Sequence, residues 1–227
     1  MKSLFQGVVS SLSIAAGYIP IAFGFALTAM EAGLSPELTL LVSIAVFAGA
    51  SQFILVALLA SGAGIVSTLG TVLMMNARHL FYGPAILPRL KAAGRGLPTP
   101  LLAFGLTDEV FATASGHLEK LTPEARETWL LGLEAGAYSA WVGGTLLGVT
   151  LGAGMDALPP AVDAALEFIL PALFFVLLLE VGVRQWLGTI LTTALVSAAL
   201  MTVLPGYHAL VLGMLAGGAF NLLGGRP

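Results

Sequence analysis

The sequence predicts an all-α integral membrane protein whose helices cross the bilayer several times. Hydrophobic residues form 58% of the 227 residues and charged residues only 9%, whereas soluble domains carry about 25% charged residues. Leu38 to Ala77 contains no charged side chain, which is enough chain for two helical crossings of about 20 residues each. The apolar runs are continuous rather than alternating, which excludes a membrane β-barrel.

Composition also limits the partners and the number of domains. The net charge of −3 is scattered along the chain and gives no basic face for nucleic acid. The absence of cysteine excludes thiolate metal sites, and His79, His117 and His208 lack metal-ligand spacing. We expect a single transporter domain over residues 1–227, surrounded by lipid and without a cofactor.

Eight apolar stretches follow one another along the chain. They cover residues 8–30, 38–61, 64–88, 100–117, 128–152, 161–182, 185–204 and 206–222. The first stretch is too long for a signal peptide, and Gly17 and Pro20 lie in its middle rather than at a cleavage site. We therefore expect it to be a retained transmembrane helix.

The placement of Lys and Arg predicts that the fourth stretch does not cross. Basic residues lie at 89–95 and 120–126, on either side of this stretch, and cytoplasmic loops carry such residues. The stretch begins with Pro98 and Pro100 and contains Asp108 and Glu109 in its middle. A half-helix here leaves seven crossings, with an outside N-terminus; eight crossings are the alternative. In the seven-crossing arrangement Lys2 and the Glu31–Glu37 loop do not follow the charge rule.

A weak internal repeat is a further expectation. The second and third stretches resemble the sixth and seventh in length, and Gly70-Thr71 and Gly188-Thr189 occupy similar places. With seven crossings, the first three and the last three crossing segments would have opposite topology, as in inverted-repeat transporters.

Two weakened helices are candidates for a substrate site. Gly17 and Pro20 weaken the first stretch, because proline removes a backbone hydrogen bond and glycine lets a helix unwind. Gly49, Ser51 and Gln52 place small residues and an amide in the middle of the second stretch. The alternatives are a packing kink at Pro20 and a Gln52 side chain that bonds a neighbouring backbone.

Charged and polar residues complete the candidate set. Asn76 and His79 share one helical face, and we expect Asn76 to line a cavity while Arg78 snorkels to the interface. Of Asp108 and Glu109, one would balance Arg78 and the other would bind a coupling proton or a substrate ammonium. Structural ion pairing is the alternative for both. Three other acids near helix ends are expected at the membrane interface: Glu134, Glu167 and Glu180.

The motifs favour transport over catalysis. No His-Glu-x-x-His or Gly-x-Ser-x-Gly pattern occurs, so an intramembrane hydrolase ranks third. An ion or small-solute channel is the main alternative to a carrier, because a polar path rich in glycine serves both.

Several strings resemble the AzlC family of branched-chain amino acid exporters, the LIV-E class. They are Ala48-Gly49-Ala50-Ser51-Gln52-Phe53, Asn76-Ala77-Arg78-His79-Leu80-Phe81-Tyr82, Asp108-Glu109 before Phe111, Trp141 with Gly143 and Gly144, and Glu167-Phe168 before Pro171-Ala172-Leu173-Phe174. The resemblance implies export of leucine, isoleucine or valine across a bacterial cytoplasmic membrane. It also implies a small AzlD-like membrane subunit. The family usually has aspartate where this chain has Glu167, which changes the reach of a charge role there.

The residues together predict a site for a zwitterionic amino acid. Gln52, Asn76 and amides at the broken helices would bind the carboxylate. Carbonyls freed near Gly17 and Gly49, together with Asp108, would bind the ammonium.

Overall fold

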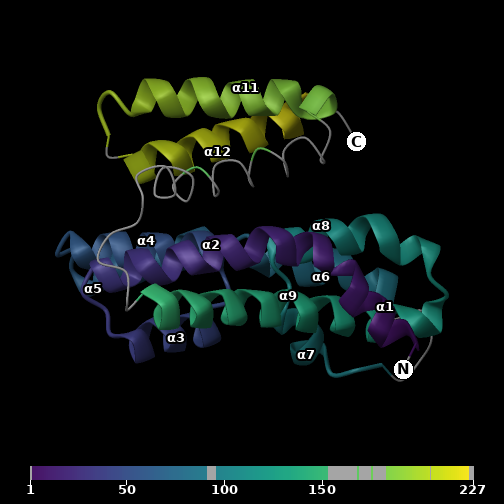
Figure 1. Cartoon of the computed structure of the whole chain (residues 1–227). Helices are drawn as coiled ribbons and strands as arrows, with labels where there is room; N and C mark the ends of the chain where they lie inside the picture. Colours follow the sequence, from purple (N-terminus) through teal and green to yellow (C-terminus); the bar gives the residue numbers. More distant parts are fainter. Residues whose placement is uncertain are drawn as a thin grey trace. The chain divides into compact units, whose positions relative to one another are not determined.

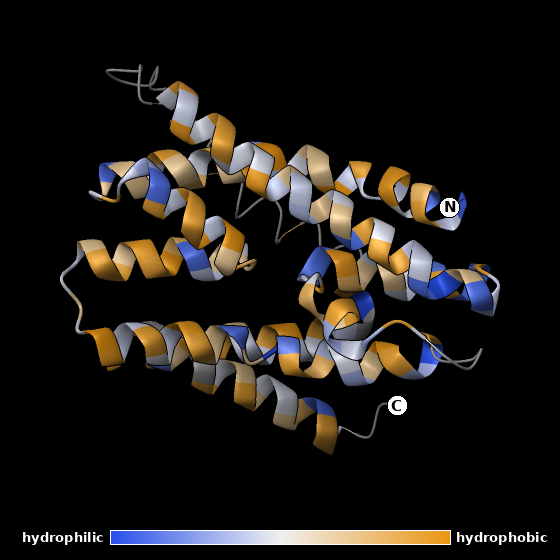
Figure 2. Ribbon diagram, turned by 90° about the horizontal axis from the view of Figure 1, so that it is seen from below, coloured by the Kyte–Doolittle hydropathy of each residue, from blue (hydrophilic) through white to orange (hydrophobic). Residues whose placement is uncertain are grey.

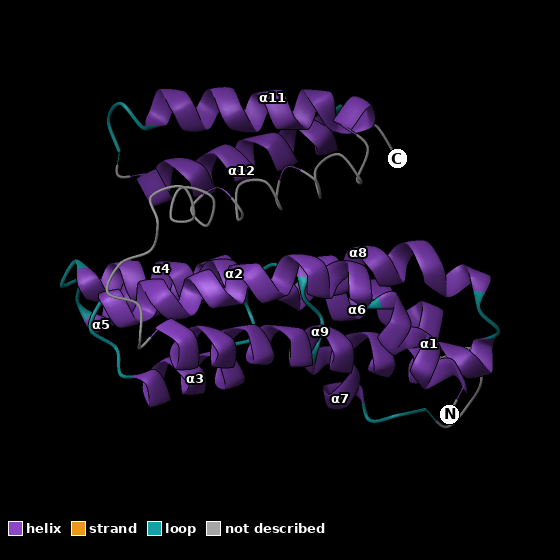
Figure 3. Cartoon of the chain, viewed as in Figure 1, coloured by secondary structure: helices purple, strands orange, loops and turns teal. Residues whose placement is uncertain are grey.

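The computed structural model describes residues 2–90, 96–152, 168, 175, 183–204 and 206–224. Within these residues every regular element is a helix (Figure 3), which confirms the all-α class. The chain forms two compact units, Met1–Pro171 and Ala172–Pro227.

The framework of the first unit is a close parallel packing of three helices, α1 (Lys2–Ser10), α2 (Leu12–Glu31) and α9 (Pro123–Gly152) (Figure 1). Every fourth residue along one stripe of α9 is small. A Cβ at Gly144 would lie 2.6 Å from the Ile19 carbonyl oxygen, and one at Gly148 would lie 2.8 Å from that of Phe23. Small residues let the backbones approach, so van der Waals packing fixes α9 against α2. The stripe comprises Gly132, Gly136, Ala140, Gly144, Gly148 and Gly152.

The second apolar stretch folds into a hairpin of two half-helices, α3 (Pro36–Ala45) and α4 (Gly49–Ala60). Ser35 caps α3 by accepting a hydrogen bond from the Leu38 N–H at 3.2 Å. Leu34, before α3, and Val56, late in α4, pack in one cluster with Ala29 near the end of α2. Both half-helices therefore lie along the C-terminal half of α2, and the turn 46–48 reaches the middle of the unit.

The third stretch is interrupted but crosses the unit. It consists of α5 (Ile65–Asn76) and α6 (His79–Leu90), separated at residues 77–78. Asn76 contacts Ser51 in the middle, and Arg89 reaches the opposite end, where its carbonyl accepts a hydrogen bond from Arg126.

The fourth stretch forms a second hairpin, from α7 (Thr99–Phe104) to α8 (Asp108–His117), which a 3-10 turn η1 (Leu118–Lys120) follows. Thr107 caps α8 by accepting from the Val110 N–H. The Leu97 N–H donates to Glu127 at 2.6 Å, and the His117 ring stacks on Trp129. Both half-helices thus lie along the N-terminal half of α9, so this hairpin enters from the end opposite to α3 and α4.

These contacts confirm one topological expectation and correct three. Arg126 donates to the Arg89 carbonyl at 2.8 Å, so the end of α6 and the start of α9 lie together, as a fourth stretch that turns back requires. The second stretch was predicted to cross, but it turns back. Thr128 donates to Ser3 at 3.0 Å, which places the N-terminal helix at the basic end and not opposite to it. The interruption expected at Gly17 and Pro20 is also wrong.

The physical reason differs between these corrections. A uniformly apolar stretch is compatible with lipid whether it crosses the bilayer or folds back. Hydropathy therefore cannot detect the turn at 46–48. At Pro20 only one backbone hydrogen bond is lost, and the packing of α2 on α9 keeps the helix continuous from Leu12 to Glu31. The chain instead turns at Ser11, between α1 and α2.

The described part of the second unit is a pair of helices, α11 (Val183–Leu200) and α12 (Gly206–Leu223). Gly213 packs against Ser197 and Thr193, and Gly217 packs against Thr193 and Thr189, so the helices are antiparallel. Most of the sixth apolar stretch lies outside the described residues, and the predicted repeat stays a prediction.

Hydrophobic residues predominate along the helices (Figure 2). Val66, Leu73 and Phe81 are 86%, 70% and 72% exposed, as lipid-facing residues would be. Among the described helices, Leu12–Glu31 alone is both long and apolar enough to span a membrane by itself. The number of crossings therefore stays a prediction.

Candidate functional site

The three interruptions meet in the middle of the first unit, against α2 and α9. We call residues 46–48 the first tip and residues 105–107 the second tip; the break at 77–78 contacts residues beside both. Broken helices expose backbone groups that need polar partners in a membrane. The side chains around these breaks form one hydrogen-bonded and aromatic assembly.

The first tip is closed by Gln52, which is fully buried. Its Nε2 donates to the Val46 carbonyl, and its Oε1 accepts from Trp141 Nε1 at 3.2 Å. Ser43 Oγ lies 3.4 Å from the same oxygen and 2.7 Å from Thr145 Oγ1. Gln52 thus bonds neighbouring backbone and side chains, as in the packing alternative.

Gly49 and Ser51 connect this tip to its surroundings. A Cβ at Gly49 would lie 2.6 Å from the Trp141 ring, so only glycine fits there without movement. Ser51 donates to Asn76 Oδ1 at 2.6 Å. His79 Nδ1 lies 3.1 Å from the Asn76 carbonyl. Ser51 and His79 therefore bond to Asn76 rather than forming a nucleophile–base pair.

The second tip holds the charges. Arg78 Nη2 lies 2.8 Å from Asp108 Oδ2, and Tyr82 donates to the same carboxylate. Arg78 thus pairs with an acid, as one of the expectations held, and its snorkelling to the interface stays a prediction. Arg78 Nε is buried and has no hydrogen-bond partner. The Arg78 side chain as a whole is 37% exposed, and this N–H is available to donate to a ligand.

Glu109 binds a different set of partners. Tyr18 donates to Glu109 Oε2 at 2.5 Å, and Tyr18 and Thr107 hydroxyls lie 2.6 Å apart. The Tyr18 ring also meets the Trp141 ring edge-on, with centroids 5.1 Å apart. The two adjacent acids thus point to separate partners, as their 100° separation on a helix predicts. Tyr18 joins the second tip to the first.

The remaining predicted residues lie elsewhere. Gly17 and Pro20 lie within continuous helix beside Tyr18, and the freed carbonyls expected there are not part of an unwound segment. Glu167 is outside the described residues. Glu134 was expected at the membrane interface, which is wrong, because it is only 4% exposed and packs against Gly105 at the second tip.

Sequence reasoning missed three contributors, Tyr18, Thr107 and Trp141. Thr107 was detectable: a threonine directly before Asp-Glu is a helix N-cap signal, and it would have placed the second tip. Tyr18 lies between Gly17 and Pro20, and the interpretation of this segment considered only the effects of those two residues on the backbone. No local pattern indicates that Trp141 reaches Gln52, because that contact depends on the hairpin.

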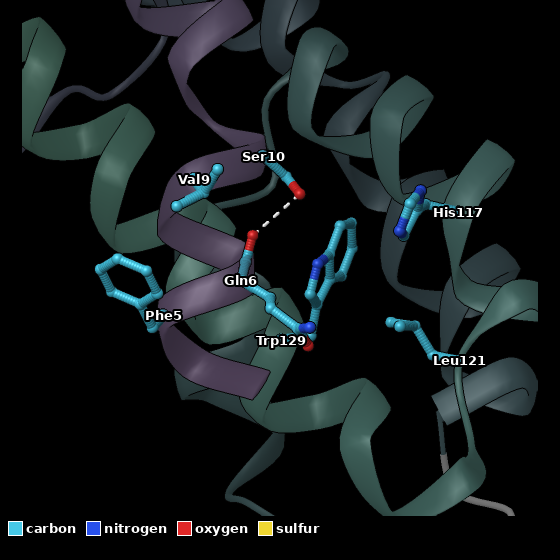
Figure 4. A pocket seen from close by; sticks show the side chains of 7 residues that line it. All are labelled: Phe5, Gln6, Val9, Ser10, His117, Leu121 and Trp129. Carbon is cyan, nitrogen blue, oxygen red and sulfur yellow. Dashed lines mark hydrogen bonds between the residues drawn. The ribbon is translucent and has the colours of Figure 1, made fainter. Parts of the chain in front are cut away.

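A separate pocket of about 400 Å³ lies between α1, the end of α8 and α9. Figure 4 shows Trp129 and His117 among its lining residues, and their rings stack with centroids 4.9 Å apart. Its lining contains no carboxylate or guanidinium: Phe5, Gln6, Val9, Ser10, His117, Leu121 and Trp129. The charged second tip is therefore the better candidate for a zwitterionic ligand.

The assembly can bind charge of both signs. Arg78 Nε offers a donor, and the carboxylates of Asp108 and Glu109 offer acceptors. Within the described part of the chain, no group of three or more His, Cys, Asp or Glu side chains could hold a metal ion. These donors and acceptors are suited to binding a polar solute.

Comparison with known proteins identifies the family of the chain. The model of the AzlC protein family matches residues 13–155, which include both tips. The inner membrane protein YgaZ of Escherichia coli is 42% identical over 193 residues, covering 85% of this chain and 78% of the relative. An uncharacterized membrane protein of Archaeoglobus fulgidus is 43% identical, covering 77% of this chain and 74% of the relative.

A more distant relative has a functional name. The branched-chain amino acid transport protein AzlC of Bacillus subtilis is 26% identical over 178 residues, covering 78% of this chain and 65% of the relative. No solved structure matches the chain. The relatives from Escherichia coli and Archaeoglobus fulgidus are named membrane proteins, and the chain belongs to the AzlC family.

Proposed function

We propose that the chain is the large subunit of a secondary transporter that exports leucine, isoleucine or valine across a bacterial cytoplasmic membrane. The observation that carries the proposal is the unpartnered Arg78 Nε beside the Asp108 carboxylate. A substrate carboxylate would accept from Arg78, and the ammonium would bind Asp108 or Glu109. The name of the Bacillus subtilis relative supports the choice of branched-chain substrates.

Aromatic rings near the tips suit an aliphatic substrate side chain. Phe47 lies in the first tip, and its ring centroid is 6.2 Å from that of Tyr18 and 5.1 Å from that of Tyr138. Such an aromatic surface binds apolar side chains without hydrogen bonds to them. It would therefore accept leucine, isoleucine and valine with similar affinity. Export direction and a small AzlD-like membrane subunit belong to the proposal on the strength of the family.

We also propose six crossings with two hairpins that turn back. The hairpins α3–α4 and α7–α8 enter from opposite ends, and the stretch 161–182 is counted from the sequence. This arrangement puts Lys2, Arg89, Lys91, Arg95, Lys120, Arg126, Arg184 and Arg226 on one side, as cytoplasmic residues. It also moves the Glu31–Glu37 loop to the outside, which removes both departures from the charge rule in the seven-crossing count.

Labelling of single cysteines tests this topology. Glu37→Cys and Ser61→Cys should both react with an impermeant thiol reagent in intact cells, whereas Thr122→Cys should react only after the cells are opened. If Glu37→Cys reacts and Ser61→Cys is protected, the second stretch crosses and the six-crossing arrangement is wrong.

Transport itself is tested in cells loaded with a valine-containing dipeptide. Expression of the chain with a family-type small subunit should lower intracellular valine, and Arg78→Gln should abolish the effect. Leu200→Ala, which lies in the second unit, should export like the parent. Unchanged intracellular valine in cells that express the parent would remove the amino-acid assignment.

A channel for small solutes is the second candidate. Two half-helix hairpins that meet from opposite ends are an arrangement also suited to a channel, where half-helix dipoles select the solute. Vesicle uptake distinguishes the two, because a carrier exchanges labelled for unlabelled leucine against a gradient and a channel does not.

A further inference from the structure

Glu134 is a buried acid that the substrate site does not use. It lies within α9, it is 4% exposed, and its Oε1 has no hydrogen-bond partner. An ionised carboxylate without a partner is expensive to bury, both in protein and in a membrane. The side chain is therefore either neutral or waiting for a cation.

The position of Glu134 connects it to the second tip. A Cβ on Gly105 would lie 2.6 Å from Glu134 Cγ and 2.9 Å from its Cδ, so the missing side chain of Gly105 makes room for this carboxyl. The Thr107 N–H donates to the Gly105 carbonyl at 3.1 Å, and Thr107 bonds Tyr18. A change of charge on Glu134 would thus act directly on the turn that positions Asp108 and Glu109.

Other titratable groups around α9 have other partners or positions. On α8, Asp108 pairs with Arg78 and Tyr82, Glu109 accepts from Tyr18, and His117 stacks on Trp129. On α9, Glu127 accepts from Leu97, Arg126 donates to the Leu121 and Arg89 carbonyls, and Tyr138 donates to the Ile44 carbonyl. Glu124 is exposed at the start of the helix. The helix α7 has no titratable side chain; the other neighbouring helices have Lys2, Tyr18, Glu31, Glu37, His79, Tyr82 and Arg89. In the described part of the chain none of these forms an ion pair or hydrogen bond with Glu134.

We propose that Glu134 is the proton-binding site that couples transport to the proton gradient. The proton binds to a carboxylate oxygen of Glu134 while the side chain is buried. It is released when water or a partner reaches the carboxylate, and the resulting change of charge moves the second tip. A metal ion would require several oxygen ligands, and one carboxylate offers too few. This assigns the coupling proton to Glu134 rather than to Asp108 or Glu109, whose carboxylates are already bound by a cation or by hydroxyl groups.

The first test measures the proton directly in the full chain in lipid bilayers. The infrared band of a protonated carboxyl should be present in the parent at neutral pH, absent in Glu134→Gln and retained in Glu124→Gln. Glu124 is an exposed acid at the start of the same helix and serves as the matched control. A spectrum of Glu134→Gln identical to that of the parent would overturn the proposal.

The second test rests on the proposed transport function. In proteoliposomes, Glu134→Gln should still exchange labelled for unlabelled leucine, but a pH gradient should no longer drive accumulation above the level reached without it. Glu134→Asp should restore part of the response. Gradient-driven accumulation by Glu134→Gln equal to the parent's would contradict the coupling role. If the parent exchanges no leucine, the substrate assignment fails, and the infrared comparison still decides whether Glu134 holds a proton.

Discussion

The two tips are built alike but differ in what they leave unsatisfied. Each is a short turn between half-helices in the middle of the unit. At the first tip, the Gln52 side chain is engaged by Val46 and Trp141, and no buried side-chain atom of residues 46–52 lacks a partner. At the second tip, Arg78 Nε and Glu134 Oε1 are both buried without one.

We infer from this difference that the first tip has a structural role and that the second tip has a binding role. A fully bonded polar network makes a turn rigid, so the first tip holds the hairpin α3–α4 in place. Unpartnered polar atoms cost free energy and are retained where a ligand or proton satisfies them. We therefore expect substitutions at the first tip to change stability and substitutions at the second to change binding.

The largest effect is expected where the Arg78–Asp108 pair is broken. The pair is only partly buried, because the Arg78 side chain is 37% exposed and that of Asp108 is 19% exposed. Leaving one charge without its partner should therefore cost about 3 kcal/mol, the low end for a buried pair, which is roughly a hundredfold in an equilibrium constant. Asp108→Asn and Arg78→Gln should each abolish valine export. In a double-mutant cycle on thermal stability, the double variant should be more stable than the sum of the single effects predicts, and strict additivity would show that the pair is not coupled.

A smaller effect is expected when the first tip is overpacked. The Cβ of Gly49→Val would overlap the Trp141 ring, and such overpacking costs about 1 to 3 kcal/mol. The melting temperature should fall, while leucine affinity of the folded protein stays close to the parent's. Gly64→Ala is the control, because a Cβ there meets no atom within 4 Å. Equal melting temperatures for both variants would mean that the first tip is not tightly packed.

The smallest effect is expected at the hydroxyl that joins the tips. Tyr18→Phe keeps the ring contact with Trp141 but removes the hydrogen bonds to Glu109 and Thr107. A hydrogen bond contributes about 1 kcal/mol net, and Thr107 can still bond the neighbouring backbone, so the loss should be about 1 to 1.5 kcal/mol. Transport should slow by roughly tenfold, as measured by initial rates of leucine exchange. An unchanged rate would show that Tyr18 only packs.

Part of this arrangement could be predicted from the sequence. The hydrophobic runs and the placement of basic residues gave the helical membrane class and the half-helix around Asp108. The polar residues Ser51, Asn76, Arg78 and Asp108 were identified because such side chains are rare inside apolar stretches.

The remainder depends on tertiary contacts that no local pattern encodes. The return of α4 along α2 depends on Val56 meeting Phe25 and Ala29, and an apolar run that crosses would have the same composition. Gln52 was expected to bind substrate or, alternatively, to bond a neighbouring backbone. The sequence does not reveal that Val46 and Trp141 bond its amide, and its role in substrate binding stays a prediction. Glu134 was wrongly expected at the membrane interface. Its burial results from the approach of Gly105 to α9, a tertiary contact that the local sequence does not show.

The central claim is that substrate binds at the second tip and that the first tip is structural. Leucine binding to the purified full chain in lipid bilayers, measured by titration calorimetry, tests it on two variants. Arg78→Lys keeps the charge but lacks the Nε–H, and loss of this contact should weaken leucine about tenfold to a hundredfold. Gln52→Leu should lower the melting temperature yet bind leucine with near-parent affinity. Near-parent binding by Arg78→Lys together with a large loss in Gln52→Leu would contradict the account and place the substrate at the first tip.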